Sequence, residues 1–311
     1  MGQEQVSPQQ EIGNNSNPRL LASSHKLTRR VKDPSFNIDE LHDYTLSLMV
    51  GIRDFQLCIT SQNSQLLLLE DYKIDGIRTV NERVAALKAI FENHHLLQAG
   101  FWKSIRLAVK THKFTQVPTD HFVKDSAKDF LLVHCDINQH MEQVHYYPHS
   151  IADAVTVFAT DARLIQWIES VYPNKKVTIT HQGSALIEGV LKYDDHSANR
   201  TLFCYFDRGI LHAISTENRH LIYYNQFAIK APEDYLKYIM LVFKELGLSQ
   251  KQSKLILWGN LKVNSKHVAY LKKYIRNISF GSRPSYLRYV FQFDEIPEHQ
   301  YFDLMNVYLC E

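Results

Sequence analysis

The chain has 311 residues, enough for two domains of ordinary size. Its 35 basic and 33 acidic side chains leave a formal net charge of +2, which excludes a general electrostatic attraction for nucleic acid or an anionic membrane. The four cysteines lie far apart and none belongs to a C-x-x-C pair, which favours free thiols in a reducing compartment. The longest aliphatic run covers only residues 66–69, and the N-terminus lacks the pattern of a secretory signal. We therefore expect a cytoplasmic protein that does not insert into a membrane and has no evident nucleic-acid surface.

The first 35 residues are rich in Gln, Asn, Ser and Pro and contain few large apolar groups. Such a segment buries too little surface to offset the entropy lost on ordering, so residues 1–35 are predicted to form a flexible tail. Its basic end, residues 27–32, is interpreted as a solvated charge cluster in preference to a docking motif.

From residue 44 onward, apolar runs alternate with turn residues. Three strands are predicted over residues 44–49, 55–60 and 65–72. A helix should begin after Thr79, with Glu82 completing a capping box. The elements predicted next are a strand over 104–109, a helix from Pro118 to about Leu132, strands over 144–147 and 154–159, a helix from Asp161 to Pro173, a strand over 177–180 and a helix over 185–191.

The polar residues 194–199 mark the best internal boundary, and the same pattern then begins again. Strands are predicted over 201–206, 210–215, 220–227 and 255–258, with helices over 232–246, 265–274 and 296–309. A shift of 155 positions places Arg53 on Arg208 and Ile59 on Ile214 without a gap. This agreement predicts an internal duplication, with a first half over 36–195 and a second over 196–311, each in the order β-β-β-α-β-α.

Two such units in tandem resemble the actin-like ATPase superfold, an α/β fold whose halves are ribonuclease H-like. Over residues 40–311 the chain is similar to the cytoplasmic actin-like proteins of pilus-assembly and secretion systems. It also resembles a Bacteroidetes family of unknown function that has this fold. The resemblance rests on the order of elements more than on signature residues.

The resemblance implies a cleft between the halves that holds ATP with magnesium. In active members, a glycine-rich hairpin in each half surrounds the phosphates, and an aspartate ends each first strand. This sequence departs from that pattern, because Met49 stands at the first aspartate position and Cys204 or Tyr205 at the second. The residues that remain as cleft candidates are Gly51, Arg53, Asp54, Asp207, Arg208, Gly209, Gly259 and Asn260.

Two of these candidates, Asp54 and Asp207, are interpreted as turn residues that hydrogen-bond locally, in preference to displaced catalytic carboxylates. Arg53 and Arg208 either clamp an anion from equivalent turns or face solvent, and we favour solvent. The sequence thus predicts a non-catalytic scaffold with a degenerate nucleotide cleft, no cofactor and a protein partner. The alternative is a nucleotide-binding switch or ATPase that uses ATP with magnesium through atypical contacts.

Other groups of reactive side chains favour structural roles. The metal-ligand types between His134 and His149 fit no standard zinc spacing, so no metal site is predicted. Ser150 lacks the G-x-S-x-G frame of a hydrolase nucleophile. The basic and aromatic residues 270–276 are interpreted as one helix with a solvated basic end, in preference to an RNA-stacking surface.

Overall fold

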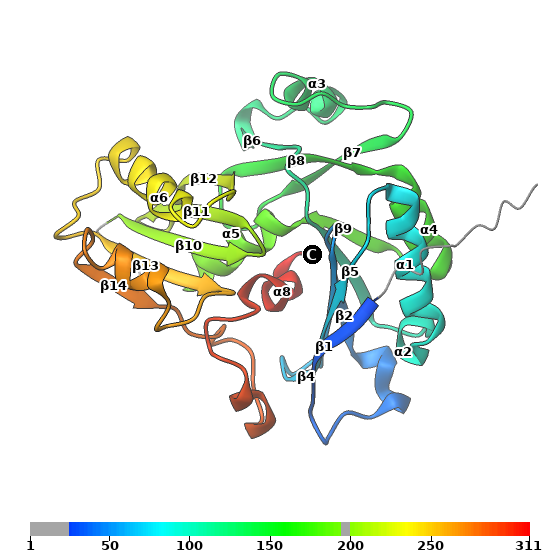
Figure 1. Ribbon diagram of the computed structural model, residues 1–311. Helices are drawn as coiled ribbons and strands as arrows, with labels where there is room; N and C mark the ends of the chain where they lie inside the picture. The colour runs from blue at the N-terminus through cyan, green and yellow to red at the C-terminus, as the bar shows by residue number, and fades with distance from the viewer. Residues whose placement is uncertain (1–24, 194–199) are drawn as a thin grey trace, which may run out of the picture.

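The computed structural model describes residues 25–193 and 200–311, and Figure 1 shows two α/β halves with a smaller third sheet beside them. The first sheet has six strands in the order β1-β4-β3-β2-β5-β9. Its strands are β1 (His25–Lys32), β2 (Thr45–Val50), β3 (Asp54–Thr60), β4 (Leu66–Ile74), β5 (Ser104–Val109) and β9 (Val177–His181). Strands β2, β5 and β9 run parallel, whereas β1, β4 and β3 join them through antiparallel pairs.

The second sheet has the order β12-β11-β10-β13-β14. Its strands are β10 (Thr201–Asp207), β11 (Ile210–Glu217), β12 (His220–Ala228), β13 (Lys254–Gly259) and β14 (Asn277–Phe280). Antiparallel β12, β11 and β10 are followed by parallel β13 and β14, which repeats the order and direction of β4-β3-β2-β5-β9. Both sheets are therefore built as the three-stranded meanders predicted, each extended by parallel strands.

The predicted boundary at residues 194–199 lies outside the described residues. The helices of the two halves are α1 (Val80–Glu92), α2 (His95–Gln98), α4 (Ala162–Val171), α5 (Gln182–Tyr193), α6 (Asp234–Glu245), α7 (Lys266–Leu271) and α8 (Phe302–Asn306). The capping box of α1 is confirmed, with Thr79 Oγ1 accepting from the Glu82 N–H and Glu82 accepting from the Thr79 N–H. At α4 the Asp161 side chain alone caps the helix, accepting from the N–H groups of Arg163 and Leu164.

A third sheet is inserted between β5 and α4. It consists of β6 (Phe114–Pro118), β8 (Ala154–Asp161) and β7 (Glu142–Pro148), all antiparallel, with α3 (Ala127–Leu132) packed against it. The helix predicted from Pro118 is wrong in its first part, because residues 119–126 form two short 3-10 turns, Thr119–His121 and Lys124–Ser126. Neither turn buries a residue, so no apolar face is available to stabilise a long helix there.

Strand β1 corrects the prediction of a flexible tail over 1–35 for residues 25–32, whereas residues 1–24 lie outside the described residues. Its residues pair with β4 from His25 opposite Ile74 to Lys32 opposite Leu68. The strand lies at an exposed edge of the sheet, and Val31 is its one buried residue. It therefore lacks the pattern of apolar residues from which a strand is predicted.

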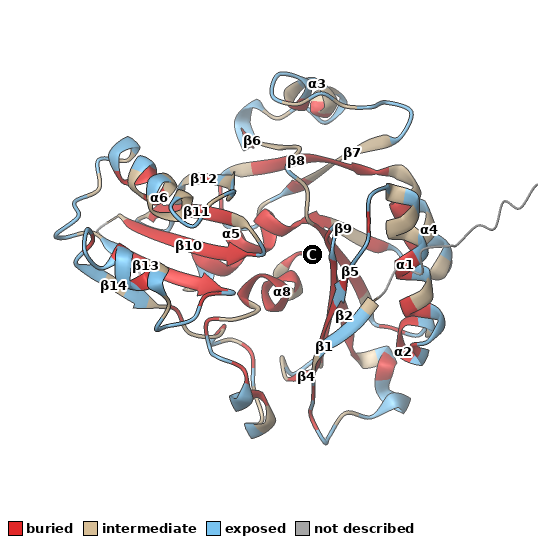
Figure 2. Cartoon of the chain, viewed as in Figure 1, coloured by how far each residue is buried: buried red, intermediate tan, exposed pale blue. Residues whose placement is uncertain are grey.

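The C-terminal segment returns to the first half. Leu304, Met305, Val307 and Cys310 belong to the core of the first sheet, whereas Phe302 stacks on Trp258 of the second at 4.2 Å. Helices α5 and α8 lie between the two sheets in Figure 1, and the buried residues in Figure 2 are continuous through them. The long closing helix predicted over 296–309 is wrong: α8 spans five residues and is followed by a 3-10 turn, Val307–Leu309. The two halves are therefore joined by a packed core as well as by the chain.

Candidate functional site

The two hairpins that carry the candidate residues end in tight turns. In the first, the Gly51 N–H donates to the Asp54 carbonyl at 2.9 Å, which leaves Ile52 and Arg53 as the turn. In the second, Asp207 pairs with Ile210 around Arg208 and Gly209, whose φ values are +43° and +88°. Two-residue turns of this kind use their backbone to close the hairpin, so few N–H groups are free to surround a phosphate.

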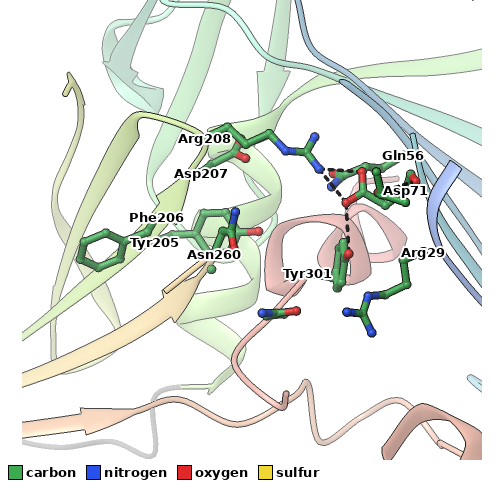
Figure 3. Close-up of a pocket in the computed structure, with 12 residues that line it drawn as sticks. Arg29, Gln56, Asp71, Tyr205, Phe206, Asp207, Arg208, Asn260 and Tyr301 are labelled. Atoms are coloured by element: carbon green, nitrogen blue, oxygen red, sulfur yellow. Dashed lines mark hydrogen bonds and ion pairs between the residues drawn. The ribbon is translucent and has the colours of Figure 1, made fainter. Parts of the chain in front are cut away.

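Arg208 reaches from the second half to two carboxylates of the first. Its Nη1 lies 2.6 Å from Asp54 Oδ2, and its Nη2 lies 2.6 Å from both Oδ1 and Oδ2 of Asp71. The Tyr301 hydroxyl, just before α8, donates to Asp71 Oδ2 at 3.1 Å (Figure 3). The guanidinium thus binds both carboxylates at once through charge-assisted hydrogen bonds.

Lys110 makes a second connection behind Arg208. This residue follows β5, and its Nζ lies 2.5 Å from Asp54 Oδ2 and 2.8 Å from Asp207 Oδ2. The Gln182 amide at the start of α5 donates to Asp207 at 2.7 Å and to Asp303 of α8 at 2.8 Å. We call the connected set Asp54, Asp71, Lys110, Gln182, Asp207, Arg208 and Asp303 the inter-half network.

Burial and pairing act in opposite directions on the carboxyl groups of this network. Burial alone would raise the pKa of Asp207, but Lys110 outweighs it and the pKa falls to about 2. Burial raises the pKa of Asp303, whose carboxyl accepts hydrogen bonds from Tyr205 and Gln182 instead of facing a cation directly. Burial lowers the pKa of Lys110, yet the nearby Asp207 and Asp54 raise it further, so the ammonium stays charged.

A cavity of about 190 Å³ lies between the halves, next to the network. Arg29, Gln56 and Asp71 line it from the first sheet, and Arg208 and Asn260 from the second half. The turn at Gly259 requires glycine, because φ is +94° and a Cβ would lie 2.2 Å from the Phe206 carbonyl oxygen. The volume is below the range of about 300–1,000 Å³ typical of small-molecule sites.

The structure brings four of the eight candidates to this cavity: Asp207, Arg208, Gly259 and Asn260. Gly51 and Gly209 shape the two turns, and Asp54 lies within the network. Arg53 is exposed and forms no ion pair with the described residues. It therefore does not join the two halves as Arg208 does.

Two interpretations of these candidates are corrected. Asp54 and Asp207 are buried and bind Lys110, so the prediction of local turn hydrogen bonding is wrong. Arg208 keeps 31% of its side chain exposed, but its guanidinium binds Asp54 and Asp71 instead of facing solvent alone. Lys110, Asp71 and Asp303 were not predicted, although adjacent Glu70 and Asp71 in an otherwise apolar strand are a signal of buried charge.

The residues present do not fit ATP with magnesium. Lys110 Nζ occupies the place between the Asp54 and Asp207 carboxylates that a divalent cation would need. Both cations of the network already bind carboxylates, so a triphosphate would add negative charge beside Asp54, Asp71 and Asp207. In residues 25–193 and 200–311, no three His, Cys, Asp or Glu side chains are placed to hold a metal ion, and His149 instead binds Glu188 at 2.9 Å.

The chain belongs to the family described as protein of unknown function (DUF3822), whose model matches residues 33–278. Its fold is similar to that of a Bacteroides thetaiotaomicron protein with actin-like ATPase fold and unknown function, at 20% identity and a TM-score of 0.75. That match covers 89% of this chain and 99% of the other. A chain of a PilM-PilN type IV pilus biogenesis complex matches at 11% identity and a TM-score of 0.57, covering 85% of this chain and 97% of that one. Comparison with curated proteins gave no match.

These similarities confirm the predicted fold: two tandem ribonuclease H-like halves in the actin-like ATPase superfold. The predicted resemblance to a Bacteroidetes family of unknown function and, more distantly, to actin-like pilus-assembly proteins is confirmed as well. In the described part of the chain, no helix is long and apolar enough to cross a membrane.

Replacing Lys110 with Met should lower the free energy of unfolding by about 3–5 kcal/mol, because Asp54 and Asp207 would lose their shared cation while staying buried. Lys113→Met is the matched control, since its partner Glu142 is 2.7 Å away but the lysine is partly exposed, and a loss of about 0–1 kcal/mol is expected. Urea unfolding measures both. Equal losses in the two variants would contradict a buried role for Lys110.

Three histidines, two of them buried and His145 partly buried, predict how stability depends on pH. Burial lowers the pKa of His145 and His181 to about 4 and that of His212 to about 3. Since the unfolded chain takes up protons below about pH 6.5 and the folded chain does not, stability should fall as pH drops from about 6.5 to 4. His212→Phe should make this fall shallower by up to about 1.4 kcal/mol per pH unit in urea titrations. An unchanged slope in His212→Phe would refute a neutral buried His212.

Proposed function

We propose that this protein is a non-catalytic member of the actin-like fold that acts by binding another protein, with a cleft that no longer takes a nucleotide. The observation that carries the proposal is the inter-half network. Lys110 and Arg208 bind the three carboxylates that flank the expected phosphate position, and these contacts join the halves without a ligand.

Opening the cleft for a nucleotide would carry a large energetic cost. Arg208 would have to leave Asp54 and Asp71, which are 7% exposed at their side chains. Separating a buried carboxylate from its cation costs about 3–5 kcal/mol, and the phosphates would then lie against the released carboxylates. Backbone contacts offer little compensation, because both hairpins close in two-residue turns.

A protein partner is supported by one surface and one similar structure. The third sheet carries exposed apolar side chains around α3, with Val123, Leu132 and Val133 exposed by 56%, 44% and 78%. Exposed apolar side chains gathered in one region are a feature of interaction surfaces. The PilM-PilN structure is a complex of two proteins, and this supports the same kind of activity for this chain.

We also retain internal duplication and a cytoplasmic location as parts of the proposal. Ser64 and Arg219, which are 155 positions apart, both have left-handed backbone, at φ +58° and +65°. That agreement and the shared strand order favour a common origin for the halves. Four free cysteines, three of them buried, favour a reducing compartment.

The proposal predicts that ATP and ADP with magnesium leave the melting temperature unchanged and give no heat of binding in calorimetry. A ligand at about one hundred times its dissociation constant would add about 2.7 kcal/mol of stability, a shift that is readily detected. A clear shift with ATP that is lost in Asp207→Ala would instead establish the alternative, a nucleotide-dependent switch with atypical contacts. Magnesium-dependent single-turnover hydrolysis would refute the non-catalytic assignment.

A further inference from the structure

Three polar side chains form a row across three neighbouring strands on the face that meets the second half. Arg29 of β1 pairs in register with Asp71 of β4, and Asp71 pairs with Gln56 of β3. A register shift in β1 between Leu27 and Arg29 lies just before the row. Irregularities of this kind redirect side chains and are frequent beside binding sites. All three residues line the cavity (Figure 3).

The middle residue of the row is satisfied and its two neighbours are not. Asp71 is bound by Arg208 and Tyr301. Arg29 is half-buried, yet its guanidinium forms no ion pair or hydrogen bond with the described residues. Gln56 is 4% exposed, and its Oε1 is buried without a hydrogen-bond partner. Such an unpaired buried acceptor is costly, so Gln56 indicates a position for a donor that comes from a ligand.

The opposite wall of the cavity also carries polar side chains without hydrogen-bond partners among the described residues. The side-chain amides of Asn260 and Gln300 line it and form no hydrogen bonds with the rest of the described chain. Tyr301, next to Gln300, has left-handed backbone at φ +58°, a strained conformation for a residue with a side chain. The cavity therefore has one unpaired cation, one unpaired buried acceptor and two free amides.

We infer that this cavity binds a small monocarboxylate with a neighbouring hydroxyl or amino group, such as an α-hydroxy or α-amino acid. The carboxylate would bind Arg29, and the hydroxyl or ammonium group would donate to Gln56 Oε1. A single unpaired guanidinium balances a single negative charge, and about 190 Å³ accommodates only a small molecule. This inference rests on the proposed function, because it requires a cleft that no nucleotide fills.

The test is isothermal calorimetry on the full chain with acetate, methylammonium, glycolate, L-lactate and the twenty L-amino acids, each as a separate probe. We expect at least one probe that has both groups to bind, and to bind about tenfold or more tightly than acetate or methylammonium, which have one group each. Arg29→Gln and Gln56→Met should each weaken that binding about tenfold or more, since each removes one of the two contacts.

Lys26→Gln is the matched control, because Lys26 lies on the same strand, is exposed and does not line the cavity. It removes the same charge and should change the affinity less than about twofold. Circular dichroism confirms that each variant is folded.

The inference is overturned if no probe binds, or if the affinity is the same in Arg29→Gln as in the unmodified protein. A parallel titration with ATP and magnesium distinguishes a failure of the proposed function from a failure of this inference. Binding of ATP overturns the proposed function, whereas the absence of binding by every probe overturns only this inference.

Discussion

The contact on which the rest of the account depends is the ion pair between Arg208 and Asp71, in which Nη2 contacts both carboxylate oxygens while Nη1 binds Asp54. It joins the hairpin of the second half to two strands of the first. Lys110 makes a second link between the halves, because its ammonium binds both Asp54 of the first half and Asp207 of the second. In the actin-like fold, the nucleotide lies between the halves at this place. Here Arg208 and Lys110 bind the carboxylates of Asp54, Asp71 and Asp207, so ion pairs of the protein itself join the two halves at this place.

The packing around the network supports this arrangement. Helices α5 and α8 lie between the two sheets, and each contributes one side chain, Gln182 and Asp303, that continues the network into the core. Leu304 belongs to the core of the first sheet, whereas Phe302, two residues earlier on α8, packs in a cluster formed by α5 and the second sheet. A large hinge motion of the kind that accompanies nucleotide exchange would disrupt this shared core as well as the ion pairs.

The sequence predicted those parts of the fold that depend on local apolar patterns. Both three-stranded meanders, the capping box at Thr79 and the order of the main elements follow from runs of buried residues and helix-start chemistry. Strand β1 was not predicted because five of its eight residues are exposed and the strand is stabilised by backbone pairing with β4. The long closing helix was predicted wrongly because residues 302–310 are buried against several elements. They do not form the apolar face of one helix.

The candidate site was only half predictable for a similar reason. Alignment of the two halves identified Arg208 and Asp207, but it gave Arg53 an equal role that its exposed turn does not support. Lys110 and Asp303 are 193 residues apart, and their proximity depends on the return of the chain to the first half. No local pattern contains that information, because ion pairing across the cleft is a property of the tertiary structure.

A double-mutant cycle on Arg208→Gln and Asp71→Asn, followed by urea unfolding, tests the central claim most directly. If the two side chains bind each other across the cleft, the loss in the double variant should differ from the sum of the single losses by about 1–3 kcal/mol. Single losses that add to within about 0.5 kcal/mol would show that the pair contributes no coupling, and would contradict a cleft held closed by its own charges.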